Sequence, residues 1–501
     1  MPAQLTTRAQ VNGYRFLLRR LDHALVRRDV RMLHDPMRSQ IRSLLVGLVL
    51  GILIVAGAAI LGLIRPQGAI GDALIVSGKQ SGALYVVVGA EDGSKTLHPV
   101  LNLASARLIT GSTAEPKSVK DSKLNDLPRG PLLGIPGAPA VLPGSGQGDR
   151  SEWTTCETIS LSAGGSAASA AGGKTTVLAG RPELGDRARA LSPSEALLVR
   201  HSGKTFLLYD GKRAELDPGN SVLARALDLS GSTPRPAGPG LLAATTPVPP
   251  LTPPQIPQAG APGPGPLARY QVGSIVAVPD APTDGTDRYL VLAGGLQPVS
   301  PFTAQLIRFA DSYGLSDIPA LAPDLLDEVP VVRALPLDHF PKEKPTVVRA
   351  EDAPVSCVSW AKDPGVAPAE GTGDAPSERA TVVLLAGTRV PIPENAHPVE
   401  LATGDGTGER VDEVYLAPGT GEYVQMTGLE PGHPRRGSLF YVTDAGLRHG
   451  VPNAEVAGVL GLSSQPRLAP WAIVGQLVPG PTLDPRDAMV ARDQLPQEPT
   501  G

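Results

Sequence analysis

Residues 44–64 read LLVGLVLGILIVAGAAILGLI, a run of 21 residues without a charge or a proline. As a helix, this run would be about 32 Å long, which is enough to cross the hydrocarbon core of a bilayer. A core helix of a water-soluble protein would need a polar face, and this run has none. A cleaved signal peptide fits less well, because the run is long and 43 residues precede it. We therefore predict one transmembrane helix over residues 43–65.

The charges that flank this segment predict its orientation. Residues 1–42 contain nine arginines and three aspartates, a net charge of +6, although the whole chain has a net charge of −4. Arginine-rich flanks stay in the cytoplasm. We expect the N-terminal arm inside the cell and the C-terminal region, about 435 residues, in the periplasm.

The predicted span contains small residues on one helix face. Their spacings of four, seven and four residues align them. Such a seam allows the backbone of another helix to approach closely, although chance is an alternative because Gly and Ala are common here. The seam residues are Gly47, Gly51, Ala58 and Gly62.

The arm, residues 1–42, has the pattern of a basic amphipathic helix. Thr7 and Gln10 have the spacing of a capping box, and an apolar stripe follows at helical spacing. Basic residues outside that stripe would suit either a cytoplasmic protein or anionic lipid headgroups. We expect Pro36 to end this helix before the span. The candidate docking residues are Arg15, Arg19, Arg27 and Arg28.

The composition favours strands, turns and linkers. The 501 residues include 57 Gly and 53 Pro, and 41% of them are hydrophobic. This apolar share supports a folded core, and the length suggests about three domains. A net charge of −4 argues against nucleic-acid binding. Two cysteines are too few for a disulfide-rich scaffold or a four-cysteine zinc site.

Four stretches of the outer region share one pattern: an apolar strand, a tight turn and an amphipathic helix. The turn glycines are 118, 84 and 151 residues apart, which excludes a solenoid of fixed period. We predict an α+β region in which four small repeat modules surround a central β domain. The predicted modules are residues 72–140, 191–232, 267–345 and 433–480.

The segments between the modules complete the predicted organisation. Residues 141–190 and 346–432 are expected to form the central β domain. Residues 233–266 contain twelve prolines and are expected to be a semi-extended linker. Residues 162–173 are expected to be a flexible loop, and residues 481–501 a C-terminal tail that packs little.

The only two cysteines, Cys156 and Cys357, both fall in the region expected outside the membrane. That compartment permits a disulfide. Trp153 lies three residues before one cysteine and Trp360 three residues after the other. We predict a bridge between the cysteines; two buried free thiols are the alternative.

A search for catalytic motifs gives no candidate. Two Gly-Lys-Thr triplets, at 173–175 and 203–205, lack the first glycine of a phosphate loop, because Ala168 and Leu198 stand there. We expect Lys174 to begin a strand and Gly203-Lys204 to form a hairpin turn. The eight histidines are scattered, and neither a His-Glu-x-x-His motif nor a Gly-x-Ser-x-Gly motif occurs. We therefore assign no catalytic, cofactor-binding or metal-binding residue.

Eleven sequence blocks closely resemble, in order and over nearly the whole chain, EccB, a core membrane component of the type VII (ESX) secretion systems of mycobacteria and their relatives. Two of the blocks are the cysteine–tryptophan pairs. The others are Gln10-Val11-x-Gly13-Tyr14-Arg15-Phe16 with Arg19-Arg20, Asp35-Pro36-x-Arg38, Arg65-Pro66-x-Gly68, Gly82-Ala83-Leu84-Tyr85-Val86, Leu101-Asn102-Leu103-Ala104-Ser105-Ala106-Arg107-Leu108, Gly134-Ile135-Pro136-Gly137-Ala138-Pro139, Val442-Thr443-Asp444-x-Gly446, Leu468-Ala469-Pro470-Trp471 and Pro479-Gly480-Pro481-Thr482-Leu483.

The resemblance implies a single-pass inner-membrane protein with a cytoplasmic N-terminus. Its elongated periplasmic domain would have a disulfide-held β core and four peripheral repeats. It also implies a six-fold complex with the ATPase EccC and with EccD and EccE, and association with the MycP protease. The resemblance favours protein docking over lipid contact for the arginine-rich arm. Some family members are called ATPases, but the departures at Ala168 and Leu198 argue against carrying that activity over.

The leading hypothesis is a structural subunit that oligomerises in the periplasm to help form a protein-export channel. One alternative is a membrane-anchored ATPase, which would need a complete nucleotide site. Another is a periplasmic module that binds the cell envelope, with the repeats gripping glycan.

Overall fold

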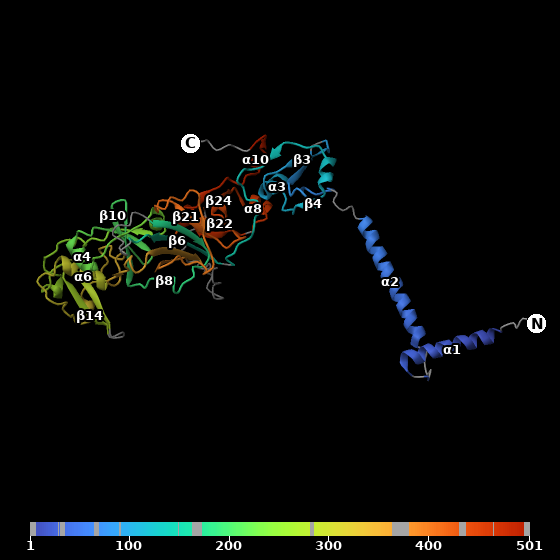
Figure 1. Cartoon of the computed structure of the whole chain (residues 1–501). Helices are drawn as coiled ribbons and strands as arrows, with labels where there is room; N and C mark the ends of the chain where they lie inside the picture. The colour runs from blue at the N-terminus through green and yellow to red at the C-terminus, as the bar shows by residue number, and fades with distance from the viewer. Residues whose placement is uncertain are drawn as a thin grey trace, which may run out of the picture. The chain divides into compact units, whose positions relative to one another are not determined.

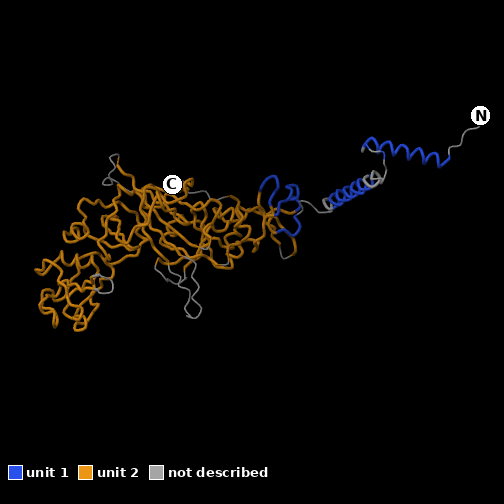
Figure 2. Tube along the Cα trace, turned by 90° about the horizontal axis from the view of Figure 1, so that it is seen from below, with its two compact units in different colours: residues 1–73, 77–82, 117–126 blue, residues 74–76, 83–116, 127–501 orange. Residues whose placement is uncertain are grey.

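The computed structural model of the chain describes residues 7–28, 30, 36–64, 70–89, 92–148, 150–162, 173–280, 285–362, 380–429, 437–463 and 465–494. It has two compact units (Figure 2). Residues 1–73, 77–82 and 117–126 form the first unit, and residues 74–76, 83–116 and 127–501 form the second. The expected flexible loop at 162–173 lies, except for its two ends, outside the described residues.

Helix α1 (Arg8–Arg27) of the first unit begins at the predicted capping box. The side chain of Thr7 accepts a hydrogen bond from the Gln10 N–H, and the Gln10 side chain accepts one from the Thr7 N–H. The helix ends at Arg28, whose backbone is left-handed with φ of 55°. The predicted amphipathic arm helix is therefore confirmed between these two caps.

Helix α2 (Pro36–Ile64) contains the predicted span (Figure 1). Its segment Ile41–Ile60 has a mean hydropathy of 2.7 and is long and apolar enough to cross a membrane. The prediction that Pro36 ends the preceding helix is wrong, because Pro36 is the first residue of α2. The first turn of a helix tolerates proline, since its N–H has no intrahelical partner there.

A small folded part of the first unit follows the span. It contains β4 (Lys117–Val119) and the 3-10 helix η1 (Asp121–Asp126). The Asp121 carboxylate accepts hydrogen bonds from the N–H groups of Gln80 and Ser81 at 3.2 and 2.9 Å. This contact ties the turn at 79–82 to η1. Strand β1 (Ile75–Gly78) contains residues of both units.

The second unit is built around a seven-stranded central sheet. Neighbouring strands are antiparallel except β21 and β7, which are parallel. The order is β20 (Val399–Glu400), β21 (Val411–Tyr415), β7 (Gly173–Ala179), β6 (Ser151–Ile159), β18 (Val355–Lys362), β19 (Ala380–Gly387) and β8 (Ala188–Ala190).

The central sheet is buried on both faces. Cys156 lies opposite Cys357 in the register of β6 and β18, and the two form the predicted disulfide. Trp153 lies opposite Trp360 in the same register, and both rings are fully buried. Because side chains alternate along a strand, the sulfurs and the rings belong to cores on opposite faces.

Four hairpins in the second unit each lead into a helix with a polar N-cap residue. In each case a side-chain oxygen of the cap accepts a hydrogen bond from a backbone N–H of the first turn. The hairpins and helices are β2 (Leu84–Gly89), β3 (Lys95–Pro99) and α3 (Leu103–Thr110); β10 (Lys204–Tyr209), β11 (Lys212–Leu216) and α4 (Ser221–Leu227); β15 (Gly285–Leu292), β16 (Gly295–Val299) and α6 (Pro301–Ala310); and β23 (Leu439–Thr443), β24 (Leu447–Val451) and α8 (Ala454–Val459). The caps are Asn102, Asn220, Ser300 and Asn453.

The remaining strands extend these hairpins into sheets. One sheet has the order β12-β9-β10-β11-β13, with β17 also on β9; another has the order β14-β15-β16, and a third β25-β22-β23-β24-β26. Their bounds are β9 (Glu195–His201), β12 (Arg235–Pro236), β13 (Thr246–Val248), β14 (Ile275–Asp280), β17 (Thr346–Val347), β22 (Gly421–Thr427), β25 (Arg467–Pro470) and β26 (Val478–Pro479). The short elements are β5 (Leu132–Leu133), β27 (Ala491–Arg492), α5 (Pro239–Ala243), η2 (Gly265–Leu267), α7 (Leu325–Glu328), α9 (Trp471–Val474) and α10 (Pro485–Ala488).

The proline-rich segment 233–266 is not the semi-extended linker we expected. It contributes two sheet strands and a helix, and Arg235 within it is 1% exposed. The guanidinium of Arg235 donates hydrogen bonds to the carbonyls of Ala353 and Val348. Proline fits here because β12 is an edge strand, where a missing N–H costs no ladder hydrogen bond.

Two further expectations need correction. Residues 481–494 do not pack loosely: Leu483 is fully buried, and β27 pairs with β5. Strand β22, which we expected in the central β domain, pairs instead with β23 and β25. In both cases the strand is placed by pairing with another segment of the chain. The local amino-acid composition does not predict such pairing.

Candidate interaction site

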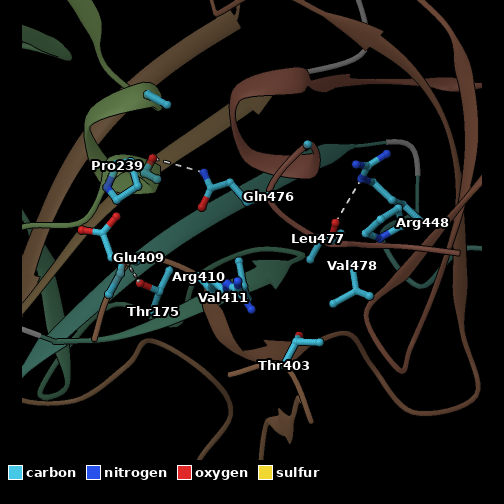
Figure 3. Close-up of a pocket in the computed structure, with 15 residues that line it drawn as sticks. Thr175, Pro239, Thr403, Glu409, Arg410, Val411, Arg448, Gln476, Leu477 and Val478 are labelled. Carbon is cyan, nitrogen blue, oxygen red and sulfur yellow. Dashed lines mark hydrogen bonds between the residues drawn. The ribbon is translucent and has the colours of Figure 1, made fainter. Parts of the chain in front are cut away.

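A pocket of about 440 Å³ opens where β7 lies next to β21 (Figure 3). Three segments form its walls: α5, the segment 475–479 that follows α9, and the loop 403–410 that leads into β21. Thr175 of β7 and Arg448 of β24 complete the lining. Backbone atoms and small apolar side chains dominate these walls, so the pocket suits an apolar group with polar neighbours.

A buried carboxylate lies against two of these walls. Glu157 of β6 is 2% exposed, and its Oε1 accepts a hydrogen bond from the Gly238 N–H at 2.7 Å. Its Oε2 has no hydrogen-bond partner among the residues that the structure describes. A Cβ on Gly408 would lie 2.6 Å from Oε1, and one on Gly238 would lie 1.9 Å from the Gly408 carbonyl oxygen. Glycine is therefore required at both positions for this close approach.

Burial raises the pKa of Glu157 to about 8, and the nearby Glu409 and Asp412 add to this rise. The hydrogen bond from Gly238 and the charge of Arg235 act in the opposite direction but are outweighed. The Glu157 carboxyl is thus largely protonated at neutral pH. In the protonated form, Glu157 adds no negative charge to a buried region that lies close to Glu409 and Asp412.

The second carboxylate of this region, Asp412 of β21, fixes the loop 403–410. Its Oδ2 accepts a hydrogen bond from the Thr175 N–H at 2.8 Å, and its Oδ1 accepts one from the Gly406 N–H at 2.7 Å. Asp412 is 5% exposed. Its two oxygens therefore join the loop to the central sheet.

Gln476 connects the wall formed by α5 to the wall formed by the segment 475–479. Its Nε2 donates a hydrogen bond to the Gly240 carbonyl at 3.1 Å and another to the Ala472 carbonyl at 2.5 Å. Its Oε1 accepts a hydrogen bond from the Thr155 hydroxyl. The pocket is therefore held by hydrogen bonds on all three sides.

An aromatic surface borders the pocket at Arg448. The Arg448 guanidinium lies 5.0 Å from the Trp471 ring centre and 5.6 Å from that of Phe440, and its Nε donates a hydrogen bond to the Leu477 carbonyl at 3.0 Å. The two rings stack with their centres 5.8 Å apart. Burial lowers the pKa of Arg448. Trp471 itself is 48% exposed.

The two Gly-Lys-Thr triplets lie in ordinary strands. Lys174 is at the start of β7, as predicted, and forms ion pairs with Glu413 and Glu400. Gly203 makes the predicted hairpin turn with φ of 78°, and Lys204 pairs with Glu215 at 2.9 Å. These ion pairs occupy both lysine side chains, which a phosphate loop would direct at a nucleotide.

The N-terminal site predictions stay predictions. Gly47 and Gly51 lie on α2, and a Cβ on either would meet nothing within 4 Å. Ala58 is exposed, whereas Gly62 falls where side-chain surroundings are not described. Arg15, Arg19 and Arg28 are exposed, and the side chain of Arg27 lies outside the described residues.

Sequence reasoning missed the pocket. Its lining comes from five separated regions, and in the described part of the chain no group of three His, Cys, Asp or Glu side chains is arranged for a metal. One signal was available: Glu157 directly follows Cys156, a cysteine of the predicted bridge in the expected central β domain. A carboxylate at such a position needs a specific partner.

Nearly the whole length of the chain is similar to known proteins of one family. The family described as "Type VII secretion system ESX-1, transport TM domain B" matches residues 3–497. The chain is 40% identical to the ESX-3 secretion system ATPase EccB3 of Mycolicibacterium smegmatis, over 98% of this chain and 92% of that protein. It is 36% identical to the ESX-1 secretion system ATPase EccB1 of Mycobacterium tuberculosis, over 100% of this chain and 98% of that protein.

Two solved structures are similar in fold. A chain in an intact ESX-5 inner membrane complex matches with a TM-score of 0.72 and 33% identity, covering 100% of this chain and 98% of that one. A chain in the EccB3 dimer from the ESX-3 core complex matches with a TM-score of 0.69 and 36% identity, covering 83% of this chain and 100% of that one.

Proposed function

Because this chain belongs to the EccB family of ESX type VII secretion proteins, we propose that it is a structural subunit of an ESX inner membrane complex. In this role it oligomerises in the periplasm and helps to form the protein-export channel. The observation that carries the proposal is the match over the full length to a chain of an intact ESX-5 inner membrane complex. The dimer known for an EccB3 protein supports self-association.

The proposed topology places the arm in the cytoplasm, α2 in the inner membrane and the second unit in the periplasm. The net charge of +6 over residues 1–42 supports this orientation. The disulfide supports it too, because such bonds persist in the periplasm and are rare in the cytoplasm. A membrane-impermeant thiol reagent, applied to spheroplasts that carry a single new cysteine at position 8 or position 141, tests it. Labelling at position 8 but not at position 141 would overturn the topology.

The four hairpin–helix segments of the second unit are proposed to be repeat modules around the central sheet. The shared order of hairpin, polar cap and helix supports this. Only the first, second and fourth caps are asparagine, and the helices have 8, 7, 10 and 6 residues. The cap residues are similar but the helices differ in length, which would suit modules that contact different neighbours.

The proposed partners are EccC, EccD, EccE and MycP, in a six-fold assembly. Arg15, Arg19, Arg27 and Arg28 of the arm would dock a cytoplasmic partner, and the small-residue seam of α2 would pack against a partner helix. Affinity purification of the tagged full-length chain in mild detergent, with mass spectrometry of the co-purifying proteins, tests this. Recovery of EccC, EccD and EccE in fixed ratios supports it; recovery of the chain alone overturns it.

ATP hydrolysis is not included in this proposal, although the curated relatives carry ATPase in their names. Lys174 and Lys204 are held in ion pairs, and the first glycine of a phosphate loop is replaced in both triplets. We expect Lys174→Ala and Lys204→Ala to leave the ATPase activity of the purified complex unchanged. Loss of activity in either variant would indicate that this subunit hydrolyses ATP.

A further inference from the structure

The surface beside the pocket combines three features. A tryptophan is half exposed, an arginine is stacked on it, and that arginine lines a preformed pocket. Tryptophan and arginine are the side chains most enriched among the residues that dominate binding energy at protein interfaces. Burial of the exposed half of Trp471 against a partner would be favourable, because it removes apolar surface from water.

The guanidinium of Arg448 is held in a fixed orientation. Its ring contacts and its hydrogen bond to the Leu477 carbonyl fix the plane of the guanidinium. Among the described residues, no carboxylate forms an ion pair with it. A planar, partly desolvated guanidinium of this kind binds a carboxylate through two parallel hydrogen bonds.

The pocket supplies the apolar half of the site. Leu477, Val478 and Val411 line it, and its volume of about 440 Å³ has room for one or two large side chains. The hydrogen bonds of Glu157, Asp412 and Gln476 hold its walls in place before any partner arrives. A preformed pocket lowers the entropy cost of binding.

The charges around the pocket set the direction of an incoming segment. Figure 3 shows Arg448 and Glu409 on opposite sides, with Arg410 and Val411 between them. A carboxylate would be repelled by Glu409 and attracted by Arg410 and Arg448, and of these two arginines Arg448 is the one whose guanidinium is fixed by ring contacts. The acidic group of a partner is therefore expected next to Trp471.

We propose that the pocket, together with Trp471, Phe440 and Arg448, is a docking site for an extended segment of a partner protein that presents an apolar side chain beside a carboxylate. The apolar side chain enters the pocket, and the carboxylate pairs with Arg448. This proposal deepens the function proposed above and rests on it, since the partner would belong to the same periplasmic assembly.

Photo-cross-linking in the intact membrane complex tests the proposal. Benzoylphenylalanine replaces Trp471 or Val478 in the full-length chain, and the cross-linked peptide is identified by mass spectrometry. The expected peptide comes from another subunit and carries an apolar residue next to Asp or Glu. Val141 is 65% exposed but is not among the pocket residues, so benzoylphenylalanine there should not give this peptide.

A charge exchange tests the pairing itself. Arg448→Glu should lower the cross-link yield at Val478 at least about tenfold. A Lys at the acidic position of the partner should restore that yield. Arg448→Lys keeps the charge without the planar guanidinium and should give an intermediate yield, which also serves if the Glu variant fails to fold.

The outcomes separate this inference from the proposed function. A cross-link to lipid, to a second copy of this chain or to a segment without a carboxylate would overturn the inference, as would a yield that Arg448→Glu leaves unchanged. If the chain still co-purifies with the complex in those cases, only the inference fails. If the chain purifies alone, the proposed function fails as well.

Discussion

Trp153 and Trp360 lie directly opposite each other on β6 and β18, three register positions from the disulfide that joins Cys156 to Cys357. Because the strands are antiparallel, Trp-x-x-Cys on one and Cys-x-x-Trp on the other bring both pairs into one register. The odd spacing places the rings and the sulfurs on opposite faces of the sheet. One pair of strands therefore anchors both cores of the central sheet.

Removal of the disulfide should destabilise the second unit. The bridge closes a separation of 201 residues, and loop-closure entropy predicts a loss of up to about 5 kcal/mol in the free energy of unfolding. We expect the Cys156→Ser/Cys357→Ser double variant to unfold at a clearly lower urea concentration, followed by tryptophan fluorescence. Reduction of the wild-type protein should reproduce the shift. Equal midpoints for the oxidised, reduced and double-variant proteins would contradict the account.

Glu157 should make stability depend on pH. Its pKa is raised in the folded protein from 4.5 to about 8, so the folded state keeps a proton that the unfolded state releases. The free energy of unfolding should therefore fall as the pH rises from about 4.5 to about 8. Glu157→Gln should reduce this slope and gain up to about 3 kcal/mol at pH 7.

Thermal unfolding of the purified full-length chain across this pH range measures the effect. Glu157→Leu supplies a second comparison: it also removes the titrating group, but it leaves the buried Gly238 N–H without its partner. We expect it to be less stable than Glu157→Gln at every pH by about 1–3 kcal/mol. A slope that persists in Glu157→Gln would show that another group causes it.

Two glycines of one loop should respond differently to alanine. Gly406 and Gly408 both have left-handed backbones, with φ of 67° and 84°. A Cβ on Gly406 would meet nothing within 4 Å, whereas one on Gly408 would press on Glu157 and on the Gly173 carbonyl. Gly406→Ala should cost about 1 kcal/mol from backbone strain, and Gly408→Ala at least about 2 kcal/mol. Urea midpoints measure both; equal losses would contradict the close packing of this pocket wall.

The small-residue seam of α2 offers a matched pair of variants. Gly51 lies on the seam and Gly57 does not, and a Cβ on either meets nothing within 4 Å. Gly51→Leu should therefore disturb packing against a partner helix, while Gly57→Leu leaves it intact. The yield of partner subunits after mild-detergent purification measures the difference. Equal yields from the two variants would contradict the proposal that the small-residue seam packs against a partner helix.

Features encoded by local chemistry could be predicted from the sequence. The capping box of α1, the long apolar helix, the hairpin turn at Gly203 and the bridge between Cys156 and Cys357 all depend on nearby residue types or on the absence of other candidates. The tryptophan–cysteine spacing also encoded the register of β6 and β18. That relationship can be recognised once the strands are known to pair.

Features that depend on distant pairing could not be predicted. The proline-rich segment 233–266 looks like a linker, but Arg235 binds carbonyls more than 100 residues away in the chain. The C-terminal residues look polar, yet β27 completes a pair with β5 near the start of the second unit. The pocket likewise joins five regions of the chain, and no local pattern marks such a convergence.

The native mass of the particle purified through the tagged full-length chain tests the central claim most directly. The chain alone has a mass of 51.8 kDa. As a structural subunit of an ESX inner membrane complex, it should be recovered in mild detergent in a particle many times that mass, together with several copies of itself and with other complex subunits. Recovery at the mass of a single chain plus its detergent belt, with no partner bound, would contradict the account.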